Sequence, residues 1–251
     1  MVLASGCAAR RIELPLDPGV PFADFAETYR LATMACAGVR TMTVQLALSG
    51  RAGGRGVRGR AIAGFELPAS LRLEAVAPFG PPAFILAGGA GSATLLLPRD
   101  NRVLRNTPAE EILGALIGVT LAPADLQAVL TGCVVATPGA FRGRLHRNGW
   151  ASIELSGGAT LFLERDDEGW QPRAARRPGW QVDYPSWRGN FPQTVRLRSL
   201  DPRLGVDLTA SVSQLEANVP LDPAAFTVDV PPRALDLTLA ELREAGPLRA
   251  Q

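Results

Sequence analysis

The residues with the most specific chemical implication stand at the start of the chain, where Ala4-Ser5-Gly6-Cys7 places small residues directly before a cysteine. This pattern is typical of the end of a bacterial lipoprotein signal, in which the cysteine sulfur receives the lipid and becomes the new N-terminus. We therefore expect Cys7 to be lipidated and residues 1–7 to be the remnant of a signal. Two or more lipid chains would anchor the rest of the protein stably to a membrane surface.

The N-terminus also departs from that pattern. A lipoprotein signal needs a charged start and an apolar stretch of roughly 7–15 residues, whereas only Met1, Val2 and Leu3 precede the motif. Either the true start lies upstream, or the cysteine belongs to an ordinary N-terminus that is rich in small residues. Residues 8–21 favour lipidation, because their prolines and glycine follow neither helical nor strand periodicity and predict a flexible tether.

Few residues elsewhere have the types and spacing of a catalytic or metal-binding site. The only histidine, His146, stands beside an expected hairpin turn, and no serine occupies a Gly-x-Ser-x-Gly elbow. Asp166 and Asp167 are interpreted as a solvated turn. The glycine-rich run 88–91 leads into an expected strand, so no helix N-terminus would face a phosphate there. We predict a protein without enzyme activity, metal or cofactor.

Composition narrows the function classes further. The chain has 251 residues, of which 47% are hydrophobic, so it can bury a sizeable core. No apolar run approaches the ~20 residues of a membrane-spanning helix. A formal net charge of +2 does not argue for a nucleic-acid partner. The cluster Arg51, Arg55, Arg58 and Arg60 is either a solvated hairpin or a contact for anionic headgroups or an acidic partner.

Two cysteines remain if Cys7 carries lipid. An oxidising cell envelope would permit a disulfide between Cys36 and Cys133. The sequence does not give their distance, and the favoured interpretation is two small buried hydrophobic residues.

The periodicity of apolar residues predicts a mainly β chain with a few helices. Residues 22–37 have the apolar spacing of an amphipathic helix, and Gly38 ends it. From Val39 the period changes to two, which predicts a half-buried strand. Thr107 is the expected N-cap and Pro108 the first residue of a second helix. Further expected strands are 57–65, 70–76, 84–87, 93–97, 102–105, 141–145, 151–155, 179–184, 194–199, 206–215 and 225–230; further expected helices are 123–130 and 239–245.

One hairpin can be predicted in register. Leu145 must lie opposite Ala151 if the apolar faces of the two strands are to coincide, which leaves the loop Arg147-Asn148-Gly149 with Gly149 left-handed. The whole sheet, of around ten strands, should curl, and the two central helices laid in its mouth would enclose an apolar cavity.

The order of these elements resembles the LolB family of outer-membrane lipoproteins, which accept other lipoproteins from the periplasmic carrier LolA. The resemblance begins at Val76-Ala77-Pro78-Phe79-Gly80 and continues through two short strands and the helices 109–117 and 123–130. Segments 179–184 and 192–197 resemble the same family. The resemblance implies one domain, 22–251, folded as an incomplete, half-open antiparallel β-barrel with an N-terminal helix and a helical lid over an acyl-chain cavity.

The resemblance also implies a mechanism and partners. The partners would be a LolA-type carrier, lipoprotein acyl chains and the inner leaflet of the outer membrane, where the protein would be anchored facing the periplasm. Pro78, Phe79 and Gly80 would form a loop that enters the bilayer, and burying the Phe79 ring would gain on the order of 1.5–3 kcal/mol. The alternative is that Phe79 packs into the core at a strand end. Phe79 in place of an aliphatic residue, Pro81-Pro82 and the tail 222–251 depart from the family pattern.

We expect the cavity to be lined by the apolar face of the early strands and roofed by the central helices. The strand residues are Val44, Leu46, Leu48, Leu71 and Leu73, and the helix residues are Ile112, Leu116 and Leu126. All of these side chains also fit an ordinary filled core. Two other functions remain open at this point: a carrier of lipid or glycolipid without lipoprotein cargo, and a structural envelope lipoprotein with a solid core.

Overall fold

The computed structural model describes residues 12–77, 79–89, 91–135, 139–167 and 169–245. Within these residues, the chain folds around a 15-stranded sheet. Its strands are β1 (Val20–Pro21), β2 (Thr41–Ala52), β3 (Arg55–Glu66), β4 (Ser70–Val76), β5 (Phe84–Gly89), β6 (Ser92–Leu97), β7 (Arg102–Thr107), β8 (Ala140–Leu145), β9 (Trp150–Leu155), β10 (Ala159–Asp166), β11 (Gly169–Arg177), β12 (Trp180–Arg188), β13 (Phe191–Ser199), β14 (Asp207–Ala217) and β15 (Leu235–Asp236). The α-helices are α1 (Phe25–Ala37), α2 (Ala109–Ile117), α3 (Pro123–Thr131) and α4 (Leu239–Ala245), and Ser156–Gly158 and Pro223–Phe226 form 3₁₀ turns.

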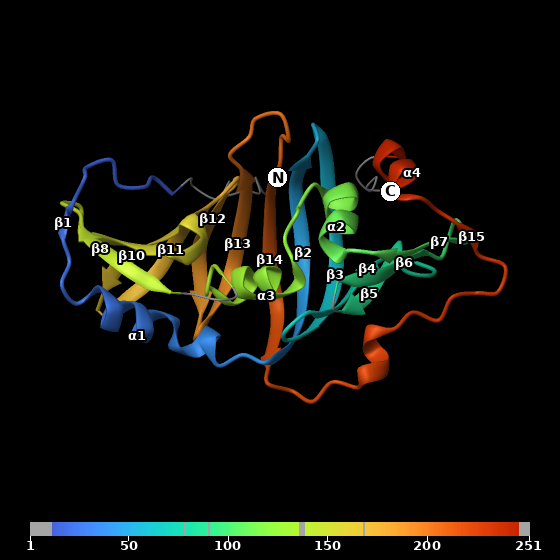
Figure 1. Ribbon diagram of the computed structural model, residues 1–251, viewed down its shortest axis with the longest axis horizontal. Helices are drawn as coiled ribbons and strands as arrows, with labels where there is room; N and C mark the ends of the chain where they lie inside the picture. The colour runs from blue at the N-terminus through green and yellow to red at the C-terminus, as the bar shows by residue number, and fades with distance from the viewer. Residues whose placement is uncertain (1–11, 78, 90, 136–138, 168, 246–251) are drawn as a thin grey trace, which may run out of the picture.

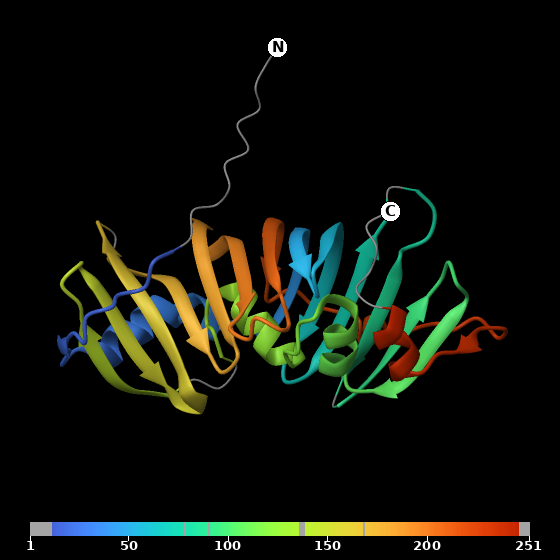
Figure 2. The same cartoon turned by 90° about the horizontal axis from the view of Figure 1, so that it is seen from above.

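The sheet is largely antiparallel and does not close. Its strand order is β1-β8-β9-β10-β11-β12-β13-β14-β2-β3-β4-β5-β6-β7-β15, and only β15 pairs with its neighbour in parallel. Chain order therefore breaks at the β14–β2 pair, which joins the two halves in the middle of the sheet (Figure 1). Seen from above, the sheet forms an arch with α2 and α3 on its inner side (Figure 2). The prediction of a mainly β, half-open fold with an N-terminal helix is confirmed.

The period-two pattern of the early strands explains the inner face of the arch. Met42, Val44 and Leu46 of β2 are buried, whereas Gln45 and Ala47, on either side of Leu46, are exposed. Strands β3, β4 and β5 continue this alternation, so one face of the sheet supplies the core and the other faces solvent.

Helix α1 lies on the inner face of the other half of the sheet, against β8 and β11. Gly143 of β8 permits this close approach, because a Cβ atom there would lie 2.2 Å from the Cβ of Phe25. The expected helix began at residue 22; in the structure Phe22 instead donates its backbone N–H to the Gly143 carbonyl. The sequence therefore placed the helix start about one turn too early.

The two central helices begin and end close to their expected positions. Thr107 is not the N-cap of α2, because it belongs to β7 opposite Ala93 and Pro108 takes the cap position. Gly118 ends α2 with φ of 74°, and a Cβ there would lie 2.8 Å from the Val206 side chain. Glycine is therefore required at this position both by the left-handed backbone conformation and by the lack of room for a side chain.

Three expectations about strands need correction. Residues 225–230 do not form a strand; Pro223–Phe226 is a 3₁₀ turn capped by Asp222, because the prolines around it cannot donate to a ladder. Phe141 is exposed because the register of β8 shifts between Ala140 and Arg142. Strands β10 and β11 were not expected at all. The predicted hairpin register is confirmed, with Leu145 opposite Ala151 and φ of 80° at Gly149.

The second half of the expected tether is not a free linker in the structure. Residues 12–21 lie against the sheet, where Ile12 and Leu14 pack on a cluster formed by Trp150, Phe162 and Ala174. Val20–Pro21 then pairs with β8 as an edge strand. Burying these apolar side chains removes the freedom of a flexible linker from this part of the segment. Cys7 and residues 8–11 lie outside the described residues.

Cys36 and Cys133 form a disulfide, which corrects the interpretation of two unpaired buried thiols. Their Cα atoms are 5.6 Å apart although 97 positions separate them in sequence. The bond ties the C-terminal end of α1 to the residue that follows α3 and Gly132, so it links a helix of one half of the fold to the central helices.

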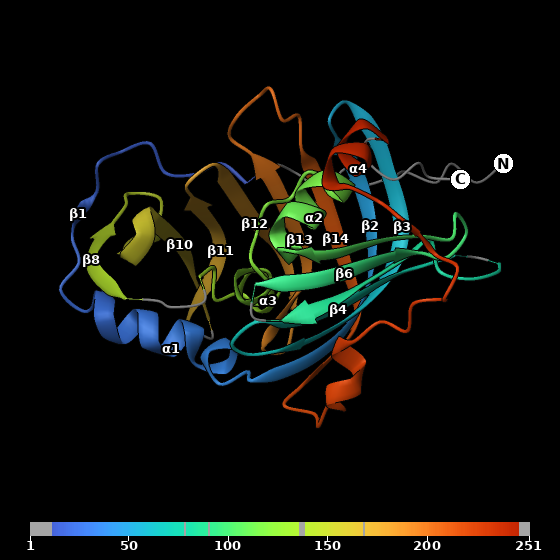
Figure 3. The same cartoon turned by 45° about the vertical axis from the view of Figure 1, so that its right-hand side comes forward.

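Helix α4 lies beside α2, as Figure 3 shows. Its N-terminus is a capping box, in which Glu241 accepts from the Thr238 N–H at 2.7 Å and the Thr238 hydroxyl accepts from the Glu241 N–H at 3.2 Å. Arg102 of β7 also binds Glu241, and Arg243 binds Glu111 of α2. These contacts hold the C-terminal helix over the edge of the sheet.

This capping box makes the attachment of α4 sensitive to acid. The Thr238 N–H, the Arg102 guanidinium and the Thr238 hydroxyl lower the pKa of Glu241 to about 2, from a usual value of 4.5. A carboxylate with a lowered folded-state pKa stabilises the fold fully above the unfolded value, and its contribution is lost as the pH falls from 4.5 towards 2. We expect an NMR titration of the Glu241 side chain to show this low midpoint and Arg102→Gln to raise it. A midpoint near 4.5 in the wild type would contradict the capping box.

Candidate functional site

A groove with a volume of about 1290 Å³ lies at one end of strands β2, β3, β4 and β5, next to the C-terminal end of α2. Its inner wall is apolar and comes from alternate residues of these strands and the last residue of α2. These residues are Leu48, Val57, Ala61, Leu73, Ala75, Phe84 and Ile117. The volume exceeds the roughly 300–1,000 Å³ of typical small-ligand pockets, so the groove has room for a larger ligand.

The groove exists because β3 is longer than its neighbour β4. Strand β4 ends at Val76, opposite Arg60, so residues 55–59 of β3 pair only with β2. The chain then leaves the sheet in the loop 77–83, and the Ala83 N–H donates to the Ala75 carbonyl to close the base of that loop. A notch remains between the free edge of β3 and this loop.

The predicted cavity residues fall into two groups. Leu48 and Leu73 line the groove. Val44, Leu46, Leu71, Ile112 and Leu116 are buried in the main core, and Leu126 packs against that core partly buried. The helices therefore fill the middle of the arch with packed side chains, and the open space lies at one end of strands β2–β5. Ile117, one position after Leu116, is the residue of α2 that lines the groove.

The Phe79 side chain is 89% exposed in the loop beside the groove. The alternative in which Phe79 packs into the core at a strand end is therefore wrong. Arg99, in the turn between β6 and β7, donates to the Phe79 carbonyl at 3.2 Å and connects this loop to the neighbouring turn. Gly80 has φ of 78°, which suits the sharp turn after Phe79. Pro78 lies outside the described residues.

The outer rim of the groove carries most of its charge. Arg58, Arg60 and Arg99 line it together with Asp100. Arg58 and Arg60 alternate with Val57 and Ala61 along β3, so the same short stretch gives apolar side chains to one face and guanidinium groups to the other. The arginine cluster that stands out in the sequence thus borders an apolar space.

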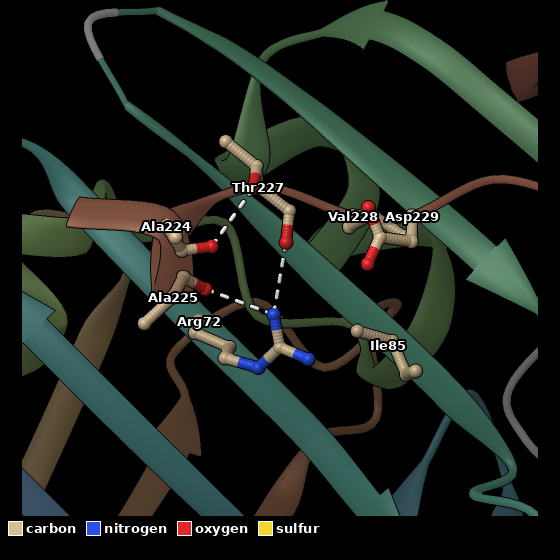
Figure 4. A pocket seen from close by; sticks show the side chains of 7 residues that line it. All are labelled: Arg72, Ile85, Ala224, Ala225, Thr227, Val228 and Asp229. Carbon is tan, nitrogen blue, oxygen red and sulfur yellow. Dashed lines mark hydrogen bonds between the residues drawn. The ribbon is translucent and has the colours of Figure 1, made fainter. Parts of the chain in front are cut away.

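A second, smaller pocket of about 450 Å³ lies on the outer face of the sheet, where the C-terminal tail crosses β4 and β5. Figure 4 shows Arg72 of β4 pointing toward this tail. Its Nη1 donates to the carbonyl oxygens of Ala225 and Thr227 at 2.8 and 2.9 Å, and its Nε donates to Glu74. Because the Arg72 guanidinium is engaged by the protein itself, we interpret this contact as a fastening of the tail.

Sequence reasoning missed one polar arrangement. His146 Nε2 lies 2.8 Å from the Ser152 hydroxyl, and its Nδ1 lies 3.1 Å from the Asp17 carbonyl oxygen and 3.5 Å from an Asp17 carboxylate oxygen. These are the residue types of a hydrolase triad, but Ser152 is buried in the middle of β9 and neither pocket is lined by it. Arg144 binds the Pro18 and Gly19 carbonyls next to it. The arrangement therefore fastens residues 17–19 to the sheet.

Neither a membrane-spanning helix nor a metal cluster occurs in the part of the chain that the structure describes. No helix there is long and apolar enough to cross a bilayer. No group of three or more histidine, cysteine or acidic side chains is arranged to hold a metal ion among the same residues.

No protein-family model matches the sequence, and no curated protein matches it. Among solved structures, the fold is similar to a LolA superfamily protein from Nitrosomonas europaea, with a TM-score of 0.54, 12% identity, and coverage of 80% of this chain and 98% of that chain. It is also similar to a DUF1329 family protein from Desulfovibrio piger (TM-score 0.49, 14% identity, 80% and 96% covered). A third similar structure is a putative outer membrane lipoprotein-sorting protein domain from Vibrio parahaemolyticus, with a TM-score of 0.46, 10% identity, and coverage of 80% of this chain and 96% of that chain. At these identities the likeness shows the fold alone: it is distantly similar to that of the LolA superfamily.

Proposed function

We propose that the protein is a non-enzymatic carrier whose groove holds the acyl chains of its ligand. The observation that carries this proposal is the apolar groove at one end of strands β2–β5 in an open sheet with a LolA-like fold. Each methylene group that leaves water for the groove wall contributes about 0.8 kcal/mol. Binding and release then need no covalent step, because acyl chains move wherever their transfer free energy is lowest.

The more specific form of the proposal is a LolB-like acceptor. In this role the protein, anchored through Cys7 in the outer membrane and facing the periplasm, takes lipoproteins from a LolA-type carrier and inserts them into the inner leaflet. The order of elements around the Phe79 loop supports this role, and so does the exposure of Phe79. An aromatic side chain beside the groove can enter the membrane interface while the acyl chains leave the groove.

A transfer assay tests the acceptor role. A LolA-type carrier loaded with a lipoprotein would be mixed with the protein and liposomes, and cargo on each component would be measured over time. We expect Phe79→Glu to accept cargo but to deliver it at least about tenfold more slowly, because it loses about 1.5–3 kcal/mol of interfacial burial and gains a charge.

Phe141→Glu is the matched control, since Phe141 is also exposed but lies on β8, away from the groove. It should deliver cargo at the wild-type rate. If the wild type takes no cargo from the carrier, the acceptor role is wrong. If Phe79→Glu delivers as fast as the wild type, the role of the loop is wrong.

A further inference from the structure

Two arginines at the rim of the groove, Arg58 and Arg60, lack the carboxylate partners that many other arginines of the described residues have. Many arginines of the described residues pair with carboxylates: Arg72 with Glu74, Arg102 with Glu241, Arg173 with Glu164 and Arg196 with Asp207. Arg58 and Arg60 are exposed, and their side chains make no hydrogen bond or ion pair within the described part of the chain. Two guanidinium groups two positions apart thus stand unneutralised at the rim of the groove, on the face of β3 opposite to the apolar wall.

We propose that the groove takes an anionic phospholipid, with its acyl chains on the apolar wall and its phosphate at Arg58 and Arg60. This inference rests on the proposed acyl-chain function and adds the chemistry of the headgroup. Charge complementarity supports it: Arg58, Arg60 and Arg99 outweigh Asp100, the one acidic side chain among the described groove residues.

The geometry of arginine suits this headgroup. A guanidinium presents a planar fork of N–H donors that matches two oxygens of a phosphate. A zwitterionic headgroup also carries a phosphate, but its own cation neutralises that charge. Val57 and Ala61 flank the two arginines on β3 and are buried at the inner wall. Residues 55–59 have no partner on the β4 side, so a ligand that passes around this free edge of β3 can contact both surfaces. Exposed charge pairs are weakened by solvent and salt, so the headgroup should set selectivity while the acyl chains set affinity.

The test offers the full-length protein, with Cys7 replaced by serine so that no lipid anchors it to the vesicles, two lipids that share their acyl chains and differ in their headgroups. Vesicles with equal amounts of phosphatidylglycerol and phosphatidylcholine, both with palmitoyl and oleoyl chains, are incubated with the protein at low ionic strength. The protein is then separated from the vesicles, and its lipid is quantified by mass spectrometry. We expect about tenfold more phosphatidylglycerol than phosphatidylcholine, the ratio that two partly exposed charge pairs supply.

Arg58→Gln/Arg60→Gln should bring this ratio close to one while total bound lipid stays similar. Arg147→Gln/Arg188→Gln is the matched control, because Arg147 lies in a turn and Arg188 ends β12, both exposed and away from the groove, and it should leave the ratio unchanged. Equal extraction of both lipids by the wild type would overturn the headgroup inference and leave the carrier function intact. Extraction of neither lipid would overturn both. Flotation with phosphatidylglycerol vesicles without extraction would assign the arginines to membrane contact and also overturn the inference.

Discussion

Replacing Cys36 and Cys133 together by serine is expected to lower the free energy of unfolding by about 3–4 kcal/mol. The disulfide closes a loop of 97 positions, and cross-linking a loop of this length removes much conformational freedom from the unfolded chain. The bond also joins α1 to the end of α3, which lie on the inner face of the same sheet. Its loss should therefore loosen both helices together and lower the melting temperature by about 10 °C.

Thermal unfolding with and without reductant measures this effect. The wild type should melt lower after reduction, whereas the double serine variant should be insensitive to reductant. Cys36→Ala/Cys133→Ala serves as a control for the polarity of serine, since both positions are buried beside Ala128. A thiol titration of the oxidised, denatured chain, produced without the lipid on Cys7, should detect one cysteine, Cys7, of the three in the sequence. Three reactive thiols, with no change on reduction, would show that the bond does not form.

The local pattern of apolar and polar residues was sufficient to predict those strands that have one buried and one exposed face. Met42, Val44 and Leu46 alternate with polar or small residues, so the face of β2 and its neighbours followed from the sequence. The C-terminal helix 239–245 was predicted with its observed bounds, because its apolar residues have helical spacing. The hairpin around Gly149 was predicted in register because only one register joins the two apolar faces.

Local patterns did not predict the features that depend on contacts between distant parts of the chain. Strand β10 carries a run of apolar residues without clear alternation, and β11 contains Pro172, which faces a shift in register at Leu163. The disulfide joins residues too far apart in sequence for any local signal to report their distance. His146 and Asp17 meet only because the N-terminal segment folds back across the sheet.

The groove was likewise predicted only in part from the sequence. Periodicity identifies the inner face that carries Leu48 and Leu73, and both line the groove. It does not indicate which part of that face is covered, because Val44, Leu46 and Leu71 lie on it too and are buried under the helices. The position of the groove depends on where β4 stops relative to β3 and where the chain leaves the sheet after Val76. The arginine cluster was visible in the sequence, but its position at the rim was not.

Filling the groove should abolish acyl-chain binding without unfolding the protein. Ala75 lies in the wall between Ala61 of β3 and Phe84 of β5 and is only partly buried. We expect Ala75→Trp to place an indole ring in the space of the acyl chain and to reduce extracted lipid by about tenfold or more. Excluding two methylene groups from the wall already costs about 1.6 kcal/mol.

The change should leave the fold intact because a side chain that points into an open groove meets less resistance than one in a packed core, where insertion costs about 1–3 kcal/mol. The melting temperature of the variant checks this point. Ala77→Trp, in the loop beside the groove, is a second blocking variant whose backbone can adjust more easily. Ala75→Ser keeps the volume open, and Ala35→Trp adds the same bulk at an exposed position of α1, so both should bind lipid as the wild type does. If folded Ala75→Trp and Ala77→Trp both retain full lipid binding, the groove is not the acyl-chain site, and the carrier function must rest on another surface.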